Sequence, residues 1–77
     1  MDINVIIFGK LVDITGSSTL TINNVIDTAQ LNEQLQNRFP GLSTYPYIIA
    51  VDKEIVHENT LLHHHNTVAL LPPYAGG

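Results

Sequence analysis

The stretch that decides the fold is residues 27–39, which read DTAQLNEQLQNRF. Apolar side chains recur in it at every fourth position: Leu31, Leu35 and Phe39. That spacing places them on one face of a helix. The pattern therefore predicts a helix over residues 28–38 whose single apolar stripe packs against a sheet.

Both ends of this helix are marked in the sequence. Asp27 is a good N-cap residue, and Gln30 follows three positions later, where its side chain can complete a capping box. Ile26 and Leu31 are spaced to form the hydrophobic staple that often accompanies such a cap. Pro40-Gly41 cannot continue a helix, so the helix is expected to end before them.

Strand patterns lie on both sides of the helix. Residues 3–8 alternate with a period of two, and Leu20 and Ile22 share one face of a second strand over residues 18–22. Residues 10–16 between them read as a short helical turn that is closed by a glycine. After the helix, three more strands are expected, around a turn at Asp52-Lys53: residues 47–51, 54–56 and 68–71. This order predicts an α+β roll, in which one main helix covers one face of a mixed, four- to five-stranded sheet.

Composition excludes several classes of protein. The 77 residues make one domain, and the absence of cysteine removes disulfides and cysteine-based metal sites. Three basic and seven acidic side chains give a net charge of −4 with no basic run, which argues against nucleic acid as a partner. The apolar runs, such as residues 5–8 and 68–71, are far too short to span a membrane. The N-terminus has no basic region of the signal-peptide type, so a cytoplasmic location is expected.

The C-terminal segment combines a rigid exit with a thin tip. Pro72-Pro73 stop the last strand, because neither residue can donate a ladder hydrogen bond. Residues 1–73 are thus expected to form the domain and residues 74–77 a flexible tail, which extends at most ~14 Å. Gly76 and Gly77 carry no side chain, so such a tip can enter a narrow channel in another protein.

This segment, Val68-Ala69-Leu70-Leu71-Pro72-Pro73-Tyr74-Ala75-Gly76-Gly77, resembles the terminus of the small subunit of molybdopterin synthase. That family of ubiquitin-like β-grasp proteins ends in a hydrophobic strand, a Pro-Pro pair, two variable residues and Gly-Gly. The opening residues 3–11, followed by Gly16, are similar to the family's first strand and helical turn. The sequence departs from the family at Val12-Asp13, where an Arg-Glu pair is common, and at His63-His64-His65-Asn66, where Asp and Gly are more usual.

The resemblance implies that this chain is a sulfur carrier and not an enzyme on its own. An ATP-dependent adenylyltransferase of the ubiquitin-activating type would convert the carboxylate of Gly77 into an acyl adenylate. A sulfur donor protein would then leave a thiocarboxylate there. The tail, with Tyr74, Ala75 and Gly76, would enter the large synthase subunit, and its sulfur would form the dithiolene of the molybdenum cofactor. ATP is used by the activating enzyme, and no cofactor is expected on this chain.

Three other functions remain open from the sequence. A carrier that supplies sulfur for the thiazole ring of thiamin uses the same fold and tail. A ubiquitin-like modifier would join Gly77 to lysines of target proteins, and it begins with the same adenylate. The third possible function is that of an interaction module whose C-terminal tail has no chemical role.

A docking patch is expected beside the tail. Phe8 and Leu71 point opposite to the side chains that should face the helix, so they are interpreted as partner-binding residues together with Pro72 and Pro73. The alternative is that a loop over residues 42–47 folds over them.

Two other groups of polar residues are interpreted as solvent-exposed rather than functional. His63, His64 and His65 are adjacent on a turn and do not converge on one ion, so no metal site is expected. The carboxylates that could be read as catalytic pairs are interpreted as solvated charges: Asp13, Glu33, Asp52 and Glu54.

Overall fold

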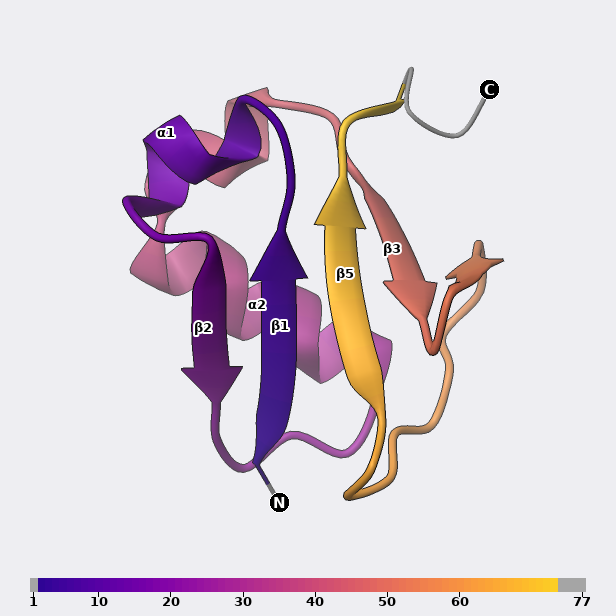
Figure 1. Cartoon of the computed structure of the whole chain (residues 1–77). Helices are drawn as coiled ribbons and strands as arrows, with labels where there is room; N and C mark the ends of the chain where they lie inside the picture. Colours follow the sequence, from indigo (N-terminus) through magenta and orange to yellow (C-terminus); the bar gives the residue numbers. More distant parts are fainter. Residues whose placement is uncertain (1, 74–77) are drawn as a thin grey trace.

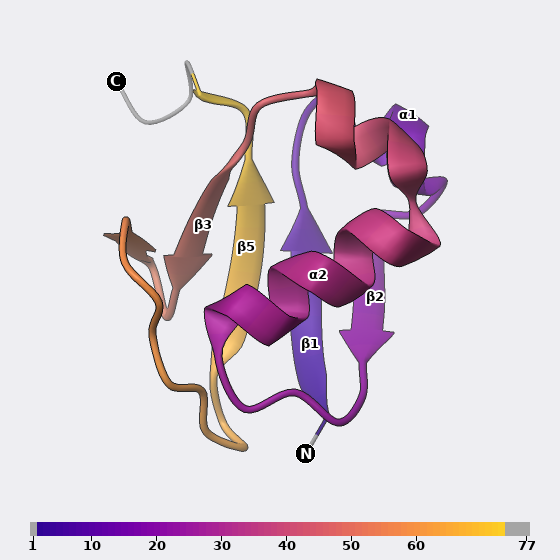
Figure 2. The ribbon, with the colours of Figure 1, turned by 180° about the vertical axis from the view of Figure 1, so that it is seen from behind.

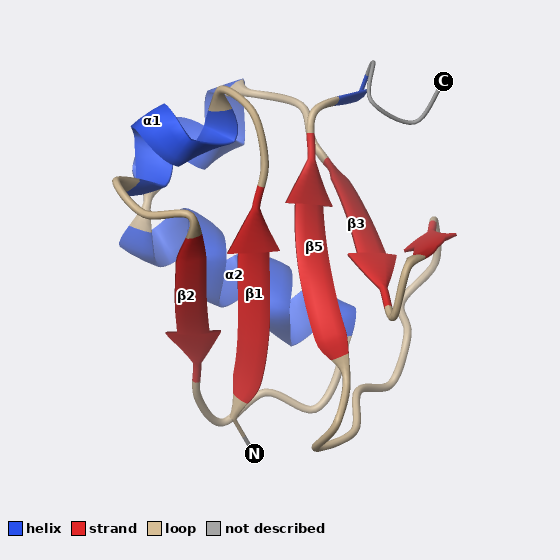
Figure 3. Cartoon of the chain, in the orientation of Figure 1, coloured by secondary structure: helices blue, strands red, loops and turns tan. Residues whose placement is uncertain are grey.

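The computed structural model describes residues 2–73 of the chain. Its elements are, in order, β1 (Ile3–Ile7), α1 (Leu11–Thr15), β2 (Thr19–Ile22), α2 (Thr28–Arg38), the 3-10 helix η1 (Pro40–Thr44), β3 (Ile48–Val51), β4 (Glu54–Val56) and β5 (Thr67–Leu71). Figure 1 and Figure 3 show one sheet with α2 lying across its far face, and Figure 2 shows that helix from the other side. The predicted α+β roll is confirmed. None of the helices within residues 2–73 is long and apolar enough to cross a membrane.

The five strands lie in the order β2-β1-β5-β3-β4. The neighbouring strands β1 and β5 are parallel, with Val5 opposite Val68, and the other neighbours are antiparallel. A parallel pair needs a long crossover, and α2 lies within the connection between β1 and β5. As a result β5, the strand that leads into the C-terminal tail, occupies the centre of the sheet.

The start of α2 is capped as expected, with one difference. The carboxylate of Asp27 accepts a hydrogen bond from the Gln30 N–H at 2.9 Å. The Gln30 side-chain oxygen accepts in return from the N–H of Ile26 at 3.1 Å, one residue before the donor that a capping box uses. The predicted staple is wrong, because Ile26 is 56% exposed and Val25 is the buried residue of this segment. Backbone bonds explain this: the Leu62 N–H donates to the Ile26 carbonyl, which fixes the segment beside residues 61–62.

The core lies between the sheet and α2, and it follows the predicted periodicities. Alternate residues of β1 and β5 point into it: Ile3, Val5, Ile7, Val68 and Leu70. From α2 it receives Leu31 and Leu35, both 0% exposed, and Phe39 packs against its edge. One face of the sheet is therefore committed to the helix, and the other face is left open.

Element boundaries differ slightly from those predicted. The strands expected from residues 18 and 47 begin one residue later, and the strand expected from residue 68 begins one earlier. Pro40-Gly41 end α2 but open η1, a short helix that the sequence pattern did not indicate. Proline is tolerated at the first turn of a helix because its missing N–H has no partner there. Leu42 of η1 is buried, so this turn closes one end of the core.

Candidate functional site

The predicted reactive group on Gly77, and the tail residues Tyr74, Ala75 and Gly76, lie outside residues 2–73 and so outside the part of the chain that the structure describes. What the structure defines is the point from which the tail leaves. Pro73 is exposed, whereas Pro72 before it is buried. The tail therefore starts from a proline whose neighbour is held in the protein.

The exit is anchored to the middle of the sheet. β5 pairs on one side with β1 and on the other with β3, up to the pair Ile48 and Leu71. One further backbone bond, from the Phe8 N–H to the Leu70 carbonyl at 3.1 Å, ties the end of β5 to the residue after β1. Beyond this point Pro72 and Pro73 cannot donate to a ladder, which ends the strand. The tail thus begins at a fixed position between two strands.

An apolar surface lies on the open face of the sheet, next to the exit. It forms a shallow hollow whose apolar lining residues come from four segments: Ile6, Phe8, Ala50, Ile55, Ala69 and Leu71. We call these six residues the open-face patch. Phe8 is 44% exposed and Ile55 is 41% exposed, and their grouping on one hollow, rather than the exposure of either alone, is typical of an interaction surface. The structure thus brings Phe8 and Leu71 together, as the alternation of their strands predicted.

The loop that was expected as an alternative cover does not reach the patch. Within residues 42–47, Leu42 is buried in the core and Tyr47 packs against it. Tyr45 and Pro46 line a separate recess with Pro72 and Pro73, and no residue of this loop lines the hollow over Phe8. The covering interpretation is therefore wrong. Leu42 draws the loop to the other face, because it has a buried site under η1.

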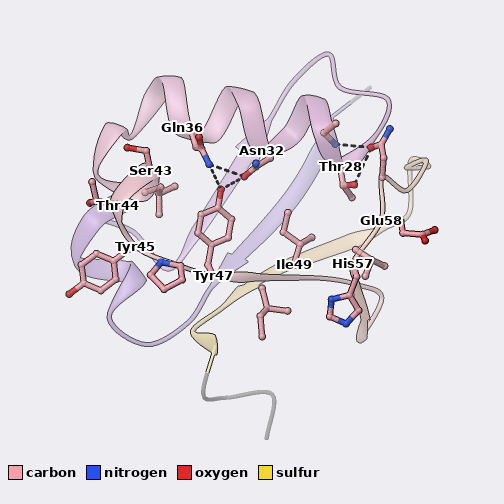
Figure 4. Close-up of a pocket in the computed structure, with 16 residues that line it drawn as sticks. Thr28, Asn32, Gln36, Ser43, Thr44, Tyr45, Tyr47, Ile49, His57 and Glu58 are labelled. Atoms are coloured by element: carbon pink, nitrogen blue, oxygen red, sulfur yellow. Dashed lines mark hydrogen bonds between the residues drawn. The ribbon is translucent and has the colours of Figure 1, made fainter.

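A wider groove lies on the helix side, between α2 and the segment from Ser43 to Asn59 (Figure 4). The hydroxyl group of Tyr47 donates to the Asn32 side chain and accepts from the Gln36 side chain, so these polar groups satisfy one another. His57 and Glu58 lie on the opposite wall of the groove. The groove is not lined by Pro72 or Pro73. These hydrogen bonds join Tyr47, the residue before β3, to α2.

The histidine turn and the isolated carboxylates are exposed. His63, His64 and His65 all lie at the surface, as the sequence indicated. Within residues 2–73, no three His, Cys, Asp or Glu side chains are grouped to hold a metal ion. Asp52 has a structural role: its carboxylate accepts from the Thr67 N–H at 2.8 Å and from the Asn66 side chain.

Several residues near the exit were not found from sequence. Ala50 and Ile55 belong to the open-face patch, and the hairpin at Asp52-Lys53 together with strand alternation could have placed them there. Lys10 and Tyr45 line the recess at the exit. They are far apart in the sequence, so no local pattern predicts that they line the same recess.

Comparisons with known proteins agree with this geometry. The sequence pattern of the ThiS family matches residues 5–77. Subunit 1 of the molybdopterin converting factor assigned in Pyrococcus furiosus has a similar fold, with a TM-score of 0.86 and 18% identity over 94% of this chain and 97% of that one. SAMP1 of Haloferax volcanii has a TM-score of 0.80 and 18% identity over 100% of both chains. A complex of subunits 1 and 2 of the molybdopterin-converting factor of Helicobacter pylori gives a TM-score of 0.75 and 29% identity over 100% of both chains. The β-grasp fold expected from the sequence is thereby confirmed.

Proposed function

The chain belongs to the ThiS family of ubiquitin-like sulfur carriers, and from this premise we propose that it is the small subunit of a molybdopterin synthase. In this proposal it carries sulfur as a thiocarboxylate on Gly77. The sulfur is delivered to a pterin precursor in the large subunit, where it forms the dithiolene of the molybdenum cofactor. The chain itself supplies the carrier group, and the acid–base residues lie on its partner.

The carboxylate of Gly77 is a poor electrophile, so the proposed chemistry begins with its activation. An oxygen of the Gly77 carboxylate attacks the α-phosphorus of ATP on an adenylating enzyme, and pyrophosphate leaves. The acyl carbon now carries AMP as a leaving group, so sulfide-level sulfur supplied by a donor can attack this carbon and displace AMP, which leaves the thiocarboxylate. A thiocarboxylate sulfur is a good nucleophile near neutral pH.

The observation that carries the proposal is the position of the exit. The tail leaves from Pro73 at the end of the central strand, two residues after Leu71, which lines the same apolar hollow as the exposed side chain of Phe8. A partner that covers this patch is positioned to receive the tail. The family match continues to residue 77, and the similar Helicobacter pylori structure is a complex of two subunits. The first finding supports a functional tail, and the second supports a large-subunit partner.

Intact mass measurement tests the carrier function. The protein is incubated with the adenylating enzyme of its source organism, ATP and a sulfur donor. We expect the mass increase of one oxygen replaced by sulfur, confined to the C-terminal peptide. A variant that lacks Gly77 should show no exchange while keeping its circular dichroism spectrum and Tm, because the buried core cluster is formed by residues between Ile3 and Leu70. Lysine-linked adducts would support a ubiquitin-like modifier instead, and an unchanged wild-type mass with a working activator would refute both.

A second assay addresses the pathway. Thiocarboxylated protein is supplied either to the large synthase subunit with its pterin precursor or to thiazole synthase with its substrates. We expect sulfur transfer in the first reaction only. Transfer only in the second would assign the chain to thiamin synthesis.

A further inference from the structure

The exit of the tail is flanked by a small recess built from three segments distant in sequence. Lys10 and Leu11 come from the start of α1, Tyr45 and Pro46 from the loop after η1, and Pro72 and Pro73 from the end of β5. Leu11 and Pro72 are buried and form its base. The other four residues are exposed and surround the exit, and we call them the exit collar: Lys10, Tyr45, Pro46 and Pro73.

The collar has the composition of a contact surface. Tyr45 is 48% exposed although it is a large aromatic residue, and Pro46 and Pro73 are rigid neighbours of it. An exposed tyrosine offers a wide apolar area and a hydroxyl group with little loss of entropy on binding. The collar is also separate from the open-face patch, since the two hollows share no lining residue.

The length of the tail places a partner on the collar. Four residues follow Pro73, and they extend at most ~14 Å. Any active site that reacts with the carbonyl carbon of Gly77 must come within that distance of Pro73. The mouth of the channel that leads to the active site must therefore lie against the residues around Pro73.

The charges on this chain indicate which charge the channel mouth of the partner presents. Two of the seven acidic residues lie at the other end of the molecule: Asp2 precedes β1, which is parallel to β5, and Asp52 lies in the turn after β3, which is antiparallel to β5. At the exit end, Lys10 lines the recess, and Asp13 of α1 does not. Lys10 thus gives the collar a positive charge on a chain whose net charge is −4.

We infer that the exit collar is a second contact surface, and that it fits a protein whose channel mouth presents a carboxylate side chain opposite Lys10. This inference rests on the proposed function, since only a protein that takes the tail meets the collar. Complementary charge at the edge of an interface mainly speeds association and fixes orientation. The open-face patch supplies apolar contact, and the collar aligns the tail with the channel.

Binding kinetics with the adenylating enzyme test the inference. Association of wild type, Lys10→Glu and Arg38→Glu is measured by surface plasmon resonance at low ionic strength and at about 1 M salt, where the Debye length is about 3 Å. Arg38 is a matched control because the change in net charge is the same and this exposed residue lines neither hollow. We expect Lys10→Glu to slow association about tenfold at low salt. The difference should vanish at high salt, and Arg38→Glu should stay close to wild type.

The outcomes separate the inference from the proposed function. Wild-type association by a folded Lys10→Glu variant would overturn the collar contact, even if wild-type protein gains its thiocarboxylate. A wild-type protein that gains none refutes the proposed function instead. Equal slowing by both variants would show a general effect of net charge and would also overturn the inference. Recovery of Lys10→Glu by a lysine in place of the facing carboxylate of the enzyme would establish the pair.

Discussion

Gly16 shows how one residue sets the backbone geometry at the end of α1. It closes α1 in the left-handed conformation, with φ of 76°, and its N–H donates to the Val12 carbonyl at 2.7 Å. A Cβ at this position would contact nothing within 4 Å, so the cost of a side chain comes from the backbone alone. We expect Gly16→Ala to lower the free energy of unfolding by about 1–2 kcal/mol. Urea denaturation followed by circular dichroism measures this change.

Asparagine provides the control for Gly16. It tolerates the left-handed region better than alanine, because its side chain can bond to the nearby backbone. Gly16→Asn should therefore lose clearly less stability than Gly16→Ala. Equal losses would mean that the conformation of residue 16 is not what limits substitution.

The role of a single residue could be predicted from the sequence where it depends on contacts with residues nearby in the chain. The N-cap at Asp27 depends on a contact three residues away, and it forms as predicted. The staple at Ile26 failed because its neighbours are set by a remote segment. Leu61 and Leu62 bridge to residues 26 and 27, and nothing near Ile26 in the sequence indicates that pairing.

At the scale of elements, the hairpin between β3 and β4 depends on its turn. Asp52 and Lys53 both have positive φ, of 49° and 72°, as in the tight turns that suit twisted hairpins. The Asp52 carboxylate also accepts from the Thr67 N–H, and the Asp52 N–H donates to the Thr67 carbonyl. This turn thereby fixes the start of β5 as well as the hairpin.

Asp52→Ala should lower the free energy of unfolding by about 1–3 kcal/mol. It removes the acceptor of the Thr67 N–H and places a less tolerant residue at positive φ. Asp52→Asn keeps a side-chain oxygen and tolerates the turn, so it should retain most of the stability. Chemical denaturation measures both variants, with Glu54→Ala as a neighbouring exposed control. A loss as large for Glu54→Ala would assign the effect to charge rather than to the turn.

Element boundaries were predictable to about one residue, because they depend on periodicity and on breaking residues. η1 was missed because Pro40-Gly41 reads as an end, whereas proline can also begin a helix. The hydrogen bonds between Tyr47 and the side chains of Asn32 and Gln36 were not predicted either, since they join two elements through side chains. A hydrophobic periodicity predicts a helix or a strand, but it does not indicate which other element that helix or strand contacts.

For the whole molecule, the decisive feature is a sheet with one covered and one open face. Alternation in residues 3–8 and 68–71 predicted two opposite sets of side chains, and the helix covers one of them. The order of the strands was not available from these patterns, because β1 and β5 pair across most of the chain. That pairing is what joins Phe8 to the exit. The function of the open face therefore becomes visible only in the assembled sheet.

Phe8 is the residue through which this open face is best tested. Because it is 44% exposed and lies outside the core, Phe8→Glu should leave the Tm nearly unchanged. A charge placed under an apolar partner must be desolvated, so we expect the Kd for the large synthase subunit to rise at least tenfold. Isothermal titration calorimetry measures that Kd.

Leu61 offers the matched control, because it is 67% exposed, it lines neither the open-face hollow nor the exit recess, and Leu61→Glu introduces the same charge. That variant should bind as wild type does. A loss of affinity confined to Phe8→Glu would place the partner on the face from which the tail leaves. Unchanged affinity in a folded Phe8→Glu protein would instead show that the partner binds the tail without covering the open face of the sheet. The open-face patch would then have to bind another molecule.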